Sequence, residues 1–291
     1  MFEFKIYLLF YINMPEAPEV ATIEKGIKKL YLGYTLTSYV FLKGKHYDKD
    51  PSLFKKFKQS LPIKLIEVTR KGKILILHFK SDDDVGNEWW VCNSFGLDGS
   101  YRKDDNKSLV SNYDLKKKQK FARLEFKDKE MLFFYDNAGF GTFFYFFNNI
   151  DKFTKYLNTF SIDVYDKDFT FAKFKENWNI VSNKNLKRKE ICAILIKQNY
   201  LCSGLGNYLK SEILYDAKIN PHKTIDKFSD KEIKDLYNSI IKICNIMLKN
   251  EGRDLKTLQV YERKNDKNGY DVKYEKTPDR KYTYWVPEVQ K

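Results

Sequence analysis

The sequence has few of the side chains that bind metal ions or form disulfides. Its 291 residues include four cysteines and three histidines, and no two cysteines form a Cys-X-X-Cys pair. Such wide spacing argues against a secreted disulfide scaffold and against a cysteine-based zinc finger. No two histidines stand at ligand spacing, so we expect neither a metal ion nor another cofactor. The residues are Cys92, Cys192, Cys202, Cys244, His46, His78 and His222.

The sequence also lacks an apolar run of about 20 residues, the length that spans a bilayer. Residues 1–13 (MFEFKIYLLFYIN) are apolar but too short, and they have neither the basic start nor the cleavage site of a secretory signal. We interpret them as an upstream extension that is not part of the mature protein, with Met14 as the true start. We expect a soluble, intracellular monomer that does not bind membranes; the sequence does not indicate its compartment.

Positive charge is abundant. The chain has 53 Lys and Arg against 39 Asp and Glu, a net charge of +14. This excess indicates an anionic partner, and the lack of a basic amphipathic helix favours nucleic acid over a membrane surface. Hydrophobic residues make up 43% of the chain and aromatic residues 16%, which excludes a disordered protein and suffices for a packed core.

From Met14 onward the pattern is first helical and then strand-like. Prolines and acids in 15–19 suit a helix start, apolar residues follow at helical spacing, and Gly33 provides the stop. Runs rich in β-branched and aromatic residues then alternate with polar turns, which predicts a two-sheet β-sandwich with an attached N-terminal helix. We expect strands at 34–43, 62–69, 73–79, 89–95, 121–127, 131–135 and 141–147.

After about residue 150 the apolar residues stand at helical spacing. Beyond Gly252 the chain is polar and Tyr-rich, and a predicted turn near Thr277-Pro278-Asp279 indicates a β-hairpin. The predicted fold class is therefore α+β. We expect helices at 169–179, 187–198, 206–217 and 229–250. We expect an N-terminal domain at 14–150, a helical domain at 151–255 and a small C-terminal module at 256–291.

Pro15 and Glu16 are the first candidate chemical groups. Removal of Met14 would leave Pro15 with a secondary amine, and terminal amines have pKa values near 8, so a useful fraction is nucleophilic at neutral pH. Such an amine can form an iminium with a carbonyl-like carbon, and Glu16 could transfer protons beside it. The alternative is that Pro-Glu simply opens a helix.

Two further places suggest phosphate binding. The run 198–212 places Gly204, Gly206 and Asn207 between two helical segments, where backbone amides and an asparagine side chain could hold a phosphate. It also fits an ordinary helix–helix turn. Lys73 stands where a strand begins and could bind phosphate or transfer protons, although most exposed lysines have no such role.

These motifs occur together and in a specific order. Met-Pro-Glu-Ala-Pro-Glu-Val, Arg-Lys-Gly-Lys-Ile-Leu-Ile-Leu and Gln-Asn…Gly-Leu-Gly-Asn-Tyr…Glu-Ile-Leu…Asn-Pro follow one another along the chain. In this order the sequence resembles the formamidopyrimidine-DNA glycosylase / endonuclease VIII family over residues 14–291. The resemblance implies a β-sandwich, a helix–two-turn–helix domain and a C-terminal finger that bind damaged DNA.

The resemblance also implies an activity. Family members are DNA glycosylases with AP lyase activity: they excise a flipped-out oxidised base through a Schiff base and cut the strand by β- and δ-elimination. The alternative is a non-catalytic nucleic-acid-binding protein on the same fold, if residues 1–13 block Pro15. The recognition loops do not indicate whether oxidised pyrimidines or ring-opened or hydantoin purines are preferred.

Five residues receive roles from the resemblance. Pro15 matches the Schiff-base nucleophile and Glu16 the acid/base that helps open the sugar. Glu19 matches a supporting acid. Lys73 matches a lysine that contacts phosphate and supports elimination. Asn207, with Gly206 before it, matches the asparagine that binds the phosphate beside the lesion.

The C-terminal finger departs from the family pattern. Val286 and Val289 stand at two of the four usual cysteine positions, and no cysteine follows Cys244. This resembles the zincless finger of some relatives, which Tyr and Trp packing holds. The family's finger arginine aligns without gaps to Lys281, whereas a one-residue shift gives Arg280, whose forked donor suits phosphate better; both stay candidates.

The loop that enters DNA departs as well. The family's two arginines before Phe-Gly are absent from 136–141, although Phe140 is retained as a stacking wedge and Leu97 occupies the place of another void-filling residue. An enzyme that cannot fill the gap left by a flipped base should work less well on intact duplex. We therefore expect a preference for single-stranded, bubble or fork DNA.

Overall fold

The computed structural model describes residues 15–42, 51–82, 86–103, 120–136, 138–183, 185–252 and 256–291. The upstream extension, and with it the expectation about Met14, lies outside these residues. The chain divides into two compact units. The first contains Pro15 and Glu19–Leu157, and the second contains Glu16–Pro18 and Asn158–Lys291.

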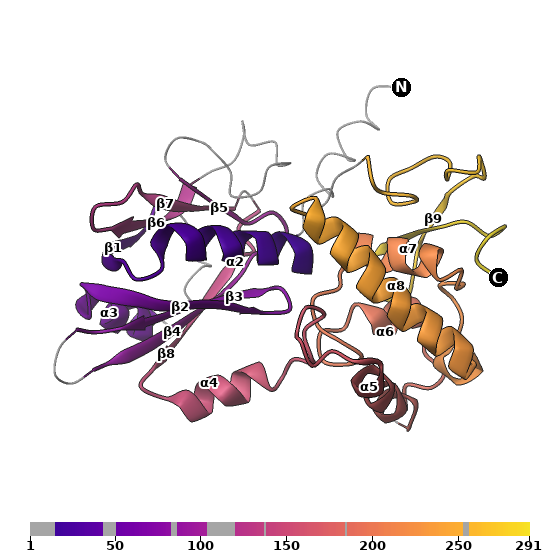
Figure 1. The fold of residues 1–291 in the computed structure, drawn as a ribbon, viewed down its shortest axis with the longest axis horizontal. Helices are drawn as coiled ribbons and strands as arrows, with labels where there is room; N and C mark the ends of the chain where they lie inside the picture. The colour runs from indigo at the N-terminus through magenta and orange to yellow at the C-terminus, as the bar shows by residue number, and fades with distance from the viewer. Residues whose placement is uncertain are drawn as a thin grey trace. The chain divides into compact units, whose positions relative to one another are not determined.

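The first unit consists mainly of antiparallel strands (Figure 1). The predicted strands are present to within a few residues, and the structure adds three elements that we did not predict: α3 (Pro51–Gln59), β5 (Ser100–Lys103) and α4 (Ile150–Leu157). The others are α2 (Ala17–Tyr31), β1 (Thr35–Phe41), β2 (Ile63–Lys71), β3 (Ile74–Lys80), β4 (Glu88–Ser94), β6 (Lys120–Phe126), β7 (Leu132–Tyr135) and β8 (Thr142–Phe147).

The two layers of the predicted sandwich come from one hydrogen-bonded sheet that folds over on itself. The strand order is β5-β7-β6-β1-β2-β3-β4-β8, and β1 and β2 share only a short register, with Thr35 opposite Lys64 and Leu36 opposite Ile63. Although β7 and β8 stand far apart in this order, the rings of Phe134 and Phe143 lie 5.3 Å apart. In Figure 1, β6 and β7 are accordingly drawn above α2 and β2–β4 below it.

The core of this unit is aromatic and is closed by α2. Val20, Ile23, Ile27 and Tyr31 stand at helical spacing on α2 and are all buried in the same cluster as the sheet residues. Since Gly33 follows the helix with φ = +84°, the chain can turn back directly into β1. Helix α2 is therefore held against the sheet by its apolar face.

The second unit is helical and ends in a hairpin (Figure 1). Three of the predicted helices are present as α5 (Phe171–Asn183), α7 (Asn207–Asp216) and α8 (Asp230–Lys249), whereas the helix predicted at 187–198 is reduced to α6 (Ile191–Leu195). The structure adds the 3-10 turn η1 (Ile225–Lys227). Ser229 and Glu232 form a capping box at the start of α8. Helix α7 has eight buried residues, from Tyr208 to Tyr215, so it forms the centre of the unit.

The predicted C-terminal hairpin is formed by β9 (Lys273–Lys276) and β10 (Tyr282–Trp285). At the position of a usual metal ligand, Val286 is fully buried and packs with Tyr215 and Val260, while Val289 packs against the same cluster. Tyr261 and Tyr284 add a ring contact at 4.8 Å. Because these valines offer no ligand atom, a zinc-bound finger does not fit the residues present.

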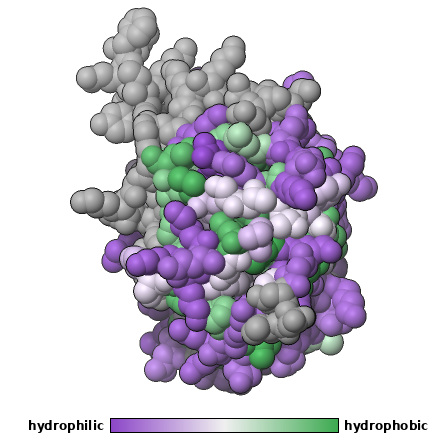
Figure 2. Space-filling view, turned by 90° about the vertical axis from the view of Figure 1, so that its left-hand side faces the viewer, coloured by the Kyte–Doolittle hydropathy of each residue, from purple (hydrophilic) through white to green (hydrophobic). Residues whose placement is uncertain are grey.

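Figure 2 shows one face of the molecule, on which apolar residues form small groups among hydrophilic ones. Of the helices that the structure describes, none is long and apolar enough to cross a membrane.

Candidate nucleic-acid site

Glu16 is buried at the start of α7. Its carboxylate accepts hydrogen bonds from the backbone N–H groups of Gly206 (2.7 Å), Tyr208 (3.0 Å) and Leu209 (3.3 Å), and its residue is only 1% exposed. A carboxylate is stabilised there because the first amides of a helix have no partner within the helix and the helix dipole is positive at this end. One acid therefore satisfies three donors.

This contact corrects our expectation for Gly206. The sequence suggested that amides at this glycine-rich helix start hold a phosphate of DNA. In the structure the Gly206 N–H donates to Glu16 instead, so the anion at this helix end comes from the protein itself. Gly204 also has an internal role, because its carbonyl accepts from Ala17 N–H at 2.9 Å.

Asn207 is the first residue of α7 and its side chain points to the hairpin. Its Nδ2 donates to the carbonyl of Tyr282 at 3.0 Å. Its Oδ1 is buried and has no hydrogen-bond partner among the described residues. The side chain therefore links the helix start to β10 and keeps one amide hydrogen for another acceptor.

The turn of the hairpin contains both candidates for the finger arginine. Arg280 N–H donates to the Thr277 carbonyl (2.8 Å) and Thr277 N–H to the Lys281 carbonyl (2.9 Å). In this turn Arg280 has φ = +63°, a left-handed conformation that favours glycine at the last loop position of a three-residue hairpin. Arg280 is exposed and Lys281 is half-buried.

A buried ion pair lies beneath this turn. Lys210 Nζ lies 2.6 Å from Asp279 Oδ2, and both side chains are fully buried. The other carboxylate oxygen accepts from Thr277 Oγ1 at 2.6 Å and from Lys281 N–H at 3.2 Å. Burial lowers the pKa of Lys210, while the Asp279 carboxylate opposes that shift. Lys210 is not among the predicted site residues, because lysines are rarely buried.

The remaining candidates near the N-terminus belong to the first unit. Pro15 and Glu19 are buried, and Glu19 lies in the first turn of α2. Lys73 is half-buried in the two-residue connection between β2 and β3, after Gly72 with φ = +58°. A glycine with positive φ at the first position of such a connection matches the twist of the flanking strands.

The two candidate wedge residues, Leu97 and Phe140, lie on adjacent loops. A Cβ added to Gly96, which has φ = +60°, would lie 2.5 Å from the Phe140 carbonyl carbon, so these loops touch through their backbones. Phe140 is 62% exposed and Leu97 is 37% exposed. The structure therefore brings together two loops that carry Leu97 and Phe140, which lie 43 residues apart in the sequence.

An acidic pair that we did not predict supports the Phe140 loop. Asp136 accepts from Gly139 N–H (2.9 Å) and Gly141 N–H (2.6 Å), and Asp98 accepts from Ala138 N–H (3.2 Å). Burial raises the pKa of Asp136 to about 7; the neighbouring Asp98 carboxyl acts in the same direction, and the two glycine N–H groups oppose it. Carboxylates thus shape the loop in which the family places arginines.

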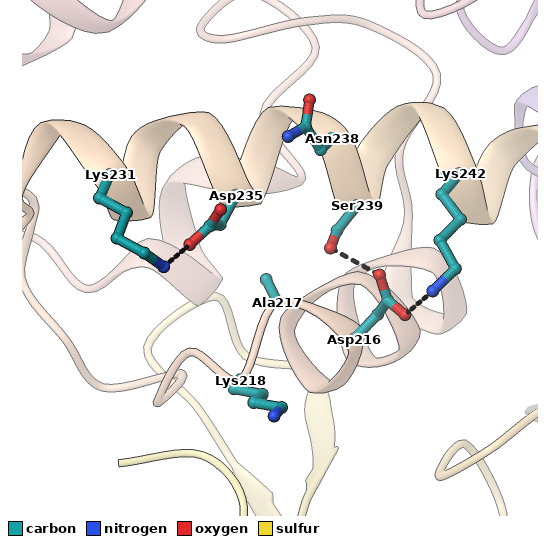
Figure 3. Close-up of a pocket in the computed structure, with 8 residues that line it drawn as sticks. All are labelled: Asp216, Ala217, Lys218, Lys231, Asp235, Asn238, Ser239 and Lys242. Atoms are coloured by element: carbon teal, nitrogen blue, oxygen red, sulfur yellow. Dashed lines mark hydrogen bonds and ion pairs between the residues drawn. The ribbon is translucent and has the colours of Figure 1, made fainter.

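A separate pocket of about 330 Å³ on the second unit contains none of these residues (Figure 3). Two of its lysines are paired, Lys242 with Asp216 and Lys231 with Asp235, and Figure 3 shows Lys218 pointing away from both pairs. Among the residues that the structure describes, no group of three or more His, Cys, Asp or Glu side chains is arranged to hold a metal ion.

Comparison with known proteins agrees with this architecture. The model of the formamidopyrimidine-DNA glycosylase N-terminal domain matches residues 14–143, and that of the formamidopyrimidine-DNA glycosylase H2TH domain matches residues 162–258. The formamidopyrimidine-DNA glycosylase of Lactococcus lactis subsp. cremoris is 27% identical over 248 residues, which cover 84% of this chain and 82% of the relative. That of Mycoplasma genitalium is 27% identical over 232 residues, covering 79% and 74%.

Solved structures show the same fold. A complex between the Lactococcus lactis Fpg and an abasic site containing DNA aligns with a TM-score of 0.76 at 22% identity, covering 95% of this chain and 99% of that chain. A structure of MutM in complex with carbocyclic 8-oxo-G containing DNA aligns with a TM-score of 0.75 at 23% identity, covering 95% and 100%. The fold and the two matched domains define a DNA glycosylase. More specifically, the chain belongs to the formamidopyrimidine-DNA glycosylase family.

Proposed function

We propose that this chain, once it begins at Pro15, is a bifunctional DNA glycosylase/AP lyase that removes oxidised bases and cuts the strand by β,δ-elimination. The observation that supports this proposal most is the setting of Glu16. It is a buried carboxylate, next in sequence to Pro15, and three backbone N–H groups hold it in place. An acid/base must be held in this way to act on one particular atom.

The first steps belong to Pro15 and Glu16. The lone pair of the Pro15 amine forms a bond to C1′ of the damaged nucleotide, and the base leaves with the electrons of its glycosidic bond. The Glu16 carboxylate takes the N–H proton of the new ammonium, which frees the nitrogen lone pair, and passes this proton to the ring oxygen O4′. O4′ departs from C1′ as the nitrogen lone pair completes the iminium. The iminium acidifies the C2′ hydrogen, which prepares the elimination.

The elimination steps need positive charge at the phosphates. Loss of the C2′ proton expels the 3′-phosphate, and a second elimination expels the 5′-phosphate. We assign phosphate contacts to Lys73, to the Asn207 amide and to Arg280, with Glu19 as a supporting acid. Arg280 is favoured over Lys281 because it is exposed and occupies a left-handed position that glycine would fill more easily. Backbone strain of this kind is retained where function requires it.

The wedge loops favour DNA that is already open. Leu97 and Phe140 supply apolar surface, but no arginine stands in 136–141 to replace the lost base pair. Flipping a base out of a duplex costs free energy, because the base must unstack and unpair, and these two side chains offset that cost only in part. The cost is smaller in single-stranded, bubble or fork DNA. Damaged DNA in these forms is the proposed substrate, and the protein is proposed to act as a monomer.

The proposal requires a free secondary amine, because a peptide bond to residue 14 would turn the Pro15 nitrogen into an amide. The test compares protein that begins at Pro15 with the full chain, using DNA that contains one oxidised base or one abasic site. We expect strand cleavage with phosphate at both new ends only when Pro15 is the first residue. DNA binding without cleavage by that protein would instead support a non-catalytic nucleic-acid-binding protein.

A further inference from the structure

Helix α7 holds the hairpin through one row of side chains. Asn207 donates to the Tyr282 carbonyl (3.0 Å), Lys210 pairs with Asp279 (2.6 Å), and Ser211 Oγ accepts from Tyr284 N–H (3.2 Å). These three helix residues stand three and four positions apart, so they share one face of α7. The start of the same helix receives the Glu16 carboxylate. One rigid element thus connects the proposed acid/base with the proposed phosphate-binding turn.

The Lys210–Asp279 pair is the unusual member of this row. Two fully buried charges are costly to remove from water, and well-packed apolar residues often stabilise a protein as much or more. The pair is also built into the turn, since Asp279 accepts from Thr277 Oγ1 and Lys281 N–H. Its carboxylate therefore touches residues on both sides of Arg280. These hydrogen bonds hold the backbone of the turn in one conformation, and stability alone would not require a buried ion pair for this purpose.

We infer that Lys210 and Asp279 are positioning residues: they fix the turn so that Arg280 presents its guanidinium to a DNA phosphate. This inference rests on the proposed function of Arg280. The pair itself touches no substrate, because both side chains are fully buried. Its effect on DNA passes through the backbone of 277–281, which holds Arg280 in its left-handed conformation.

A double-mutant cycle on DNA binding tests the inference. The reference is the double variant Lys210→Met/Asp279→Leu, in which apolar side chains replace both charges, so that stability is kept while the hydrogen bonds to Thr277 and Lys281 are lost. Arg280→Ala is then made in the wild-type chain and in this variant. The dissociation constant for a bubble oligonucleotide with one tetrahydrofuran residue, an uncleavable abasic analogue, is measured by fluorescence anisotropy.

We expect Arg280→Ala to raise the dissociation constant about tenfold in the wild-type chain and less than about twofold in the variant. The thermal midpoint of the double variant should stay near that of the wild type. An equal effect of Arg280→Ala in both backgrounds, including no effect in either, would overturn the inference. Because the cycle is measured by binding alone, failure of the proposed strand cleavage would be recognised separately.

A matched control separates positioning from general support of the C-terminal segment. Tyr215, also on α7, donates to Asp266 at 2.7 Å in the same segment but away from the turn. In Tyr215→Phe the effect of Arg280→Ala should stay near tenfold. Should the double variant fail to fold, Asp279→Asn keeps the size of the side chain and removes the carboxylate that pairs with Lys210. It should reduce the Arg280→Ala effect at least threefold, and an unchanged effect would contradict the inference.

Discussion

At the scale of single residues, the candidate site depends on side chains that serve structure and chemistry together. Glu16 both satisfies the first amides of α7 and is the proposed proton donor. Arg280 occupies a backbone conformation that costs an L-residue free energy. Stability alone favours the carboxylate at Glu16 but would favour glycine at position 280, so substitutions at the two positions should affect stability in opposite directions while both lower activity.

Glu16→Gln should slow base excision about 10²–10⁴-fold, since the amide cannot donate and regain the proton that opens the sugar. The free energy of unfolding should fall by about 1 kcal/mol, because a charged acceptor at the helix start becomes neutral. Pro15 keeps its amine, so borohydride should still trap the variant on DNA with a preformed abasic site. Single-turnover excision and trapping, measured side by side, check this; equal loss of both would contradict the assigned role.

Arg280→Gly should raise the free energy of unfolding by up to about 1 kcal/mol, because glycine adopts the left-handed conformation without the Cβ clash. The same change should slow strand cleavage, since the guanidinium is lost. Lys281→Ala is the comparison, and its effect on cleavage should be smaller. Chemical denaturation and gel-based cleavage assays provide the two readouts. A larger cleavage defect in Lys281→Ala would assign the finger role to Lys281.

At the scale of elements, the regular secondary structure follows from local pattern, but the site does not. Runs rich in β-branched and aromatic residues predict the long strands, and helical spacing of apolar residues predicts α8. The element α3 is a short helix in a Lys-rich stretch, in which only Leu53, Phe54 and Phe57 mark the helical spacing, and β5 is a polar four-residue strand whose Arg102 is buried. Glu16 and Gly206 are 190 residues apart in sequence, and no local rule predicts that contact or the burial of Lys210.

The hairpin has a second, pH-dependent attachment through His222. Its Nδ1 lies 2.9 Å from Glu190 and its Nε2 lies 3.0 Å from Glu275 on β9. Burial disfavours the charged imidazole, but hydrogen bonds to Glu275 and Glu190 outweigh it and raise the pKa of His222 above its ordinary value of 6.5. The protonated form is therefore the one that ties the hairpin to the helices.

A raised pKa in the folded state gives stability that is complete below the unfolded pKa and is lost as pH rises through the folded pKa. His222→Gln should therefore lower the thermal midpoint most near pH 6 and least above the folded pKa of His222. Midpoints measured from pH 5.5 to 9 by differential scanning fluorimetry check this. If the midpoints of the wild type and of His222→Gln differ by the same amount at every pH in that range, His222 acts through packing alone.

At the scale of the whole molecule, the sequence resemblance and the comparisons agree on the formamidopyrimidine-DNA glycosylase family. The net charge of +14 suits a polyanionic partner, and the valine-packed hairpin replaces a metal-bound finger. The chain also differs from the family pattern in the loop 136–141. This loop carries Phe140 but no arginine, and Asp136 accepts hydrogen bonds from its backbone. We therefore expect this chain to differ from other family members most in the form of DNA that it prefers, paired or unpaired.

The same oxidised base should be excised several-fold faster from a bubble or a single strand than from a matched duplex, because the duplex must lose a stacked pair that only Leu97 and Phe140 replace. Phe140→Ala should reduce excision from duplex more than from single strands. Single-turnover rates on the three substrates check this. Equal or faster excision from the duplex would contradict the proposed preference.

The central claim is that the Pro15 amine bonds to C1′ of the damaged nucleotide. Borohydride reduction during the reaction with abasic-site DNA, followed by protease and nuclease digestion and mass spectrometry, identifies the residue that holds the sugar. Our account predicts a reduced adduct on the N-terminal peptide, with the added mass on Pro15. An adduct on a lysine, or no adduct from active protein that begins at Pro15, would contradict it.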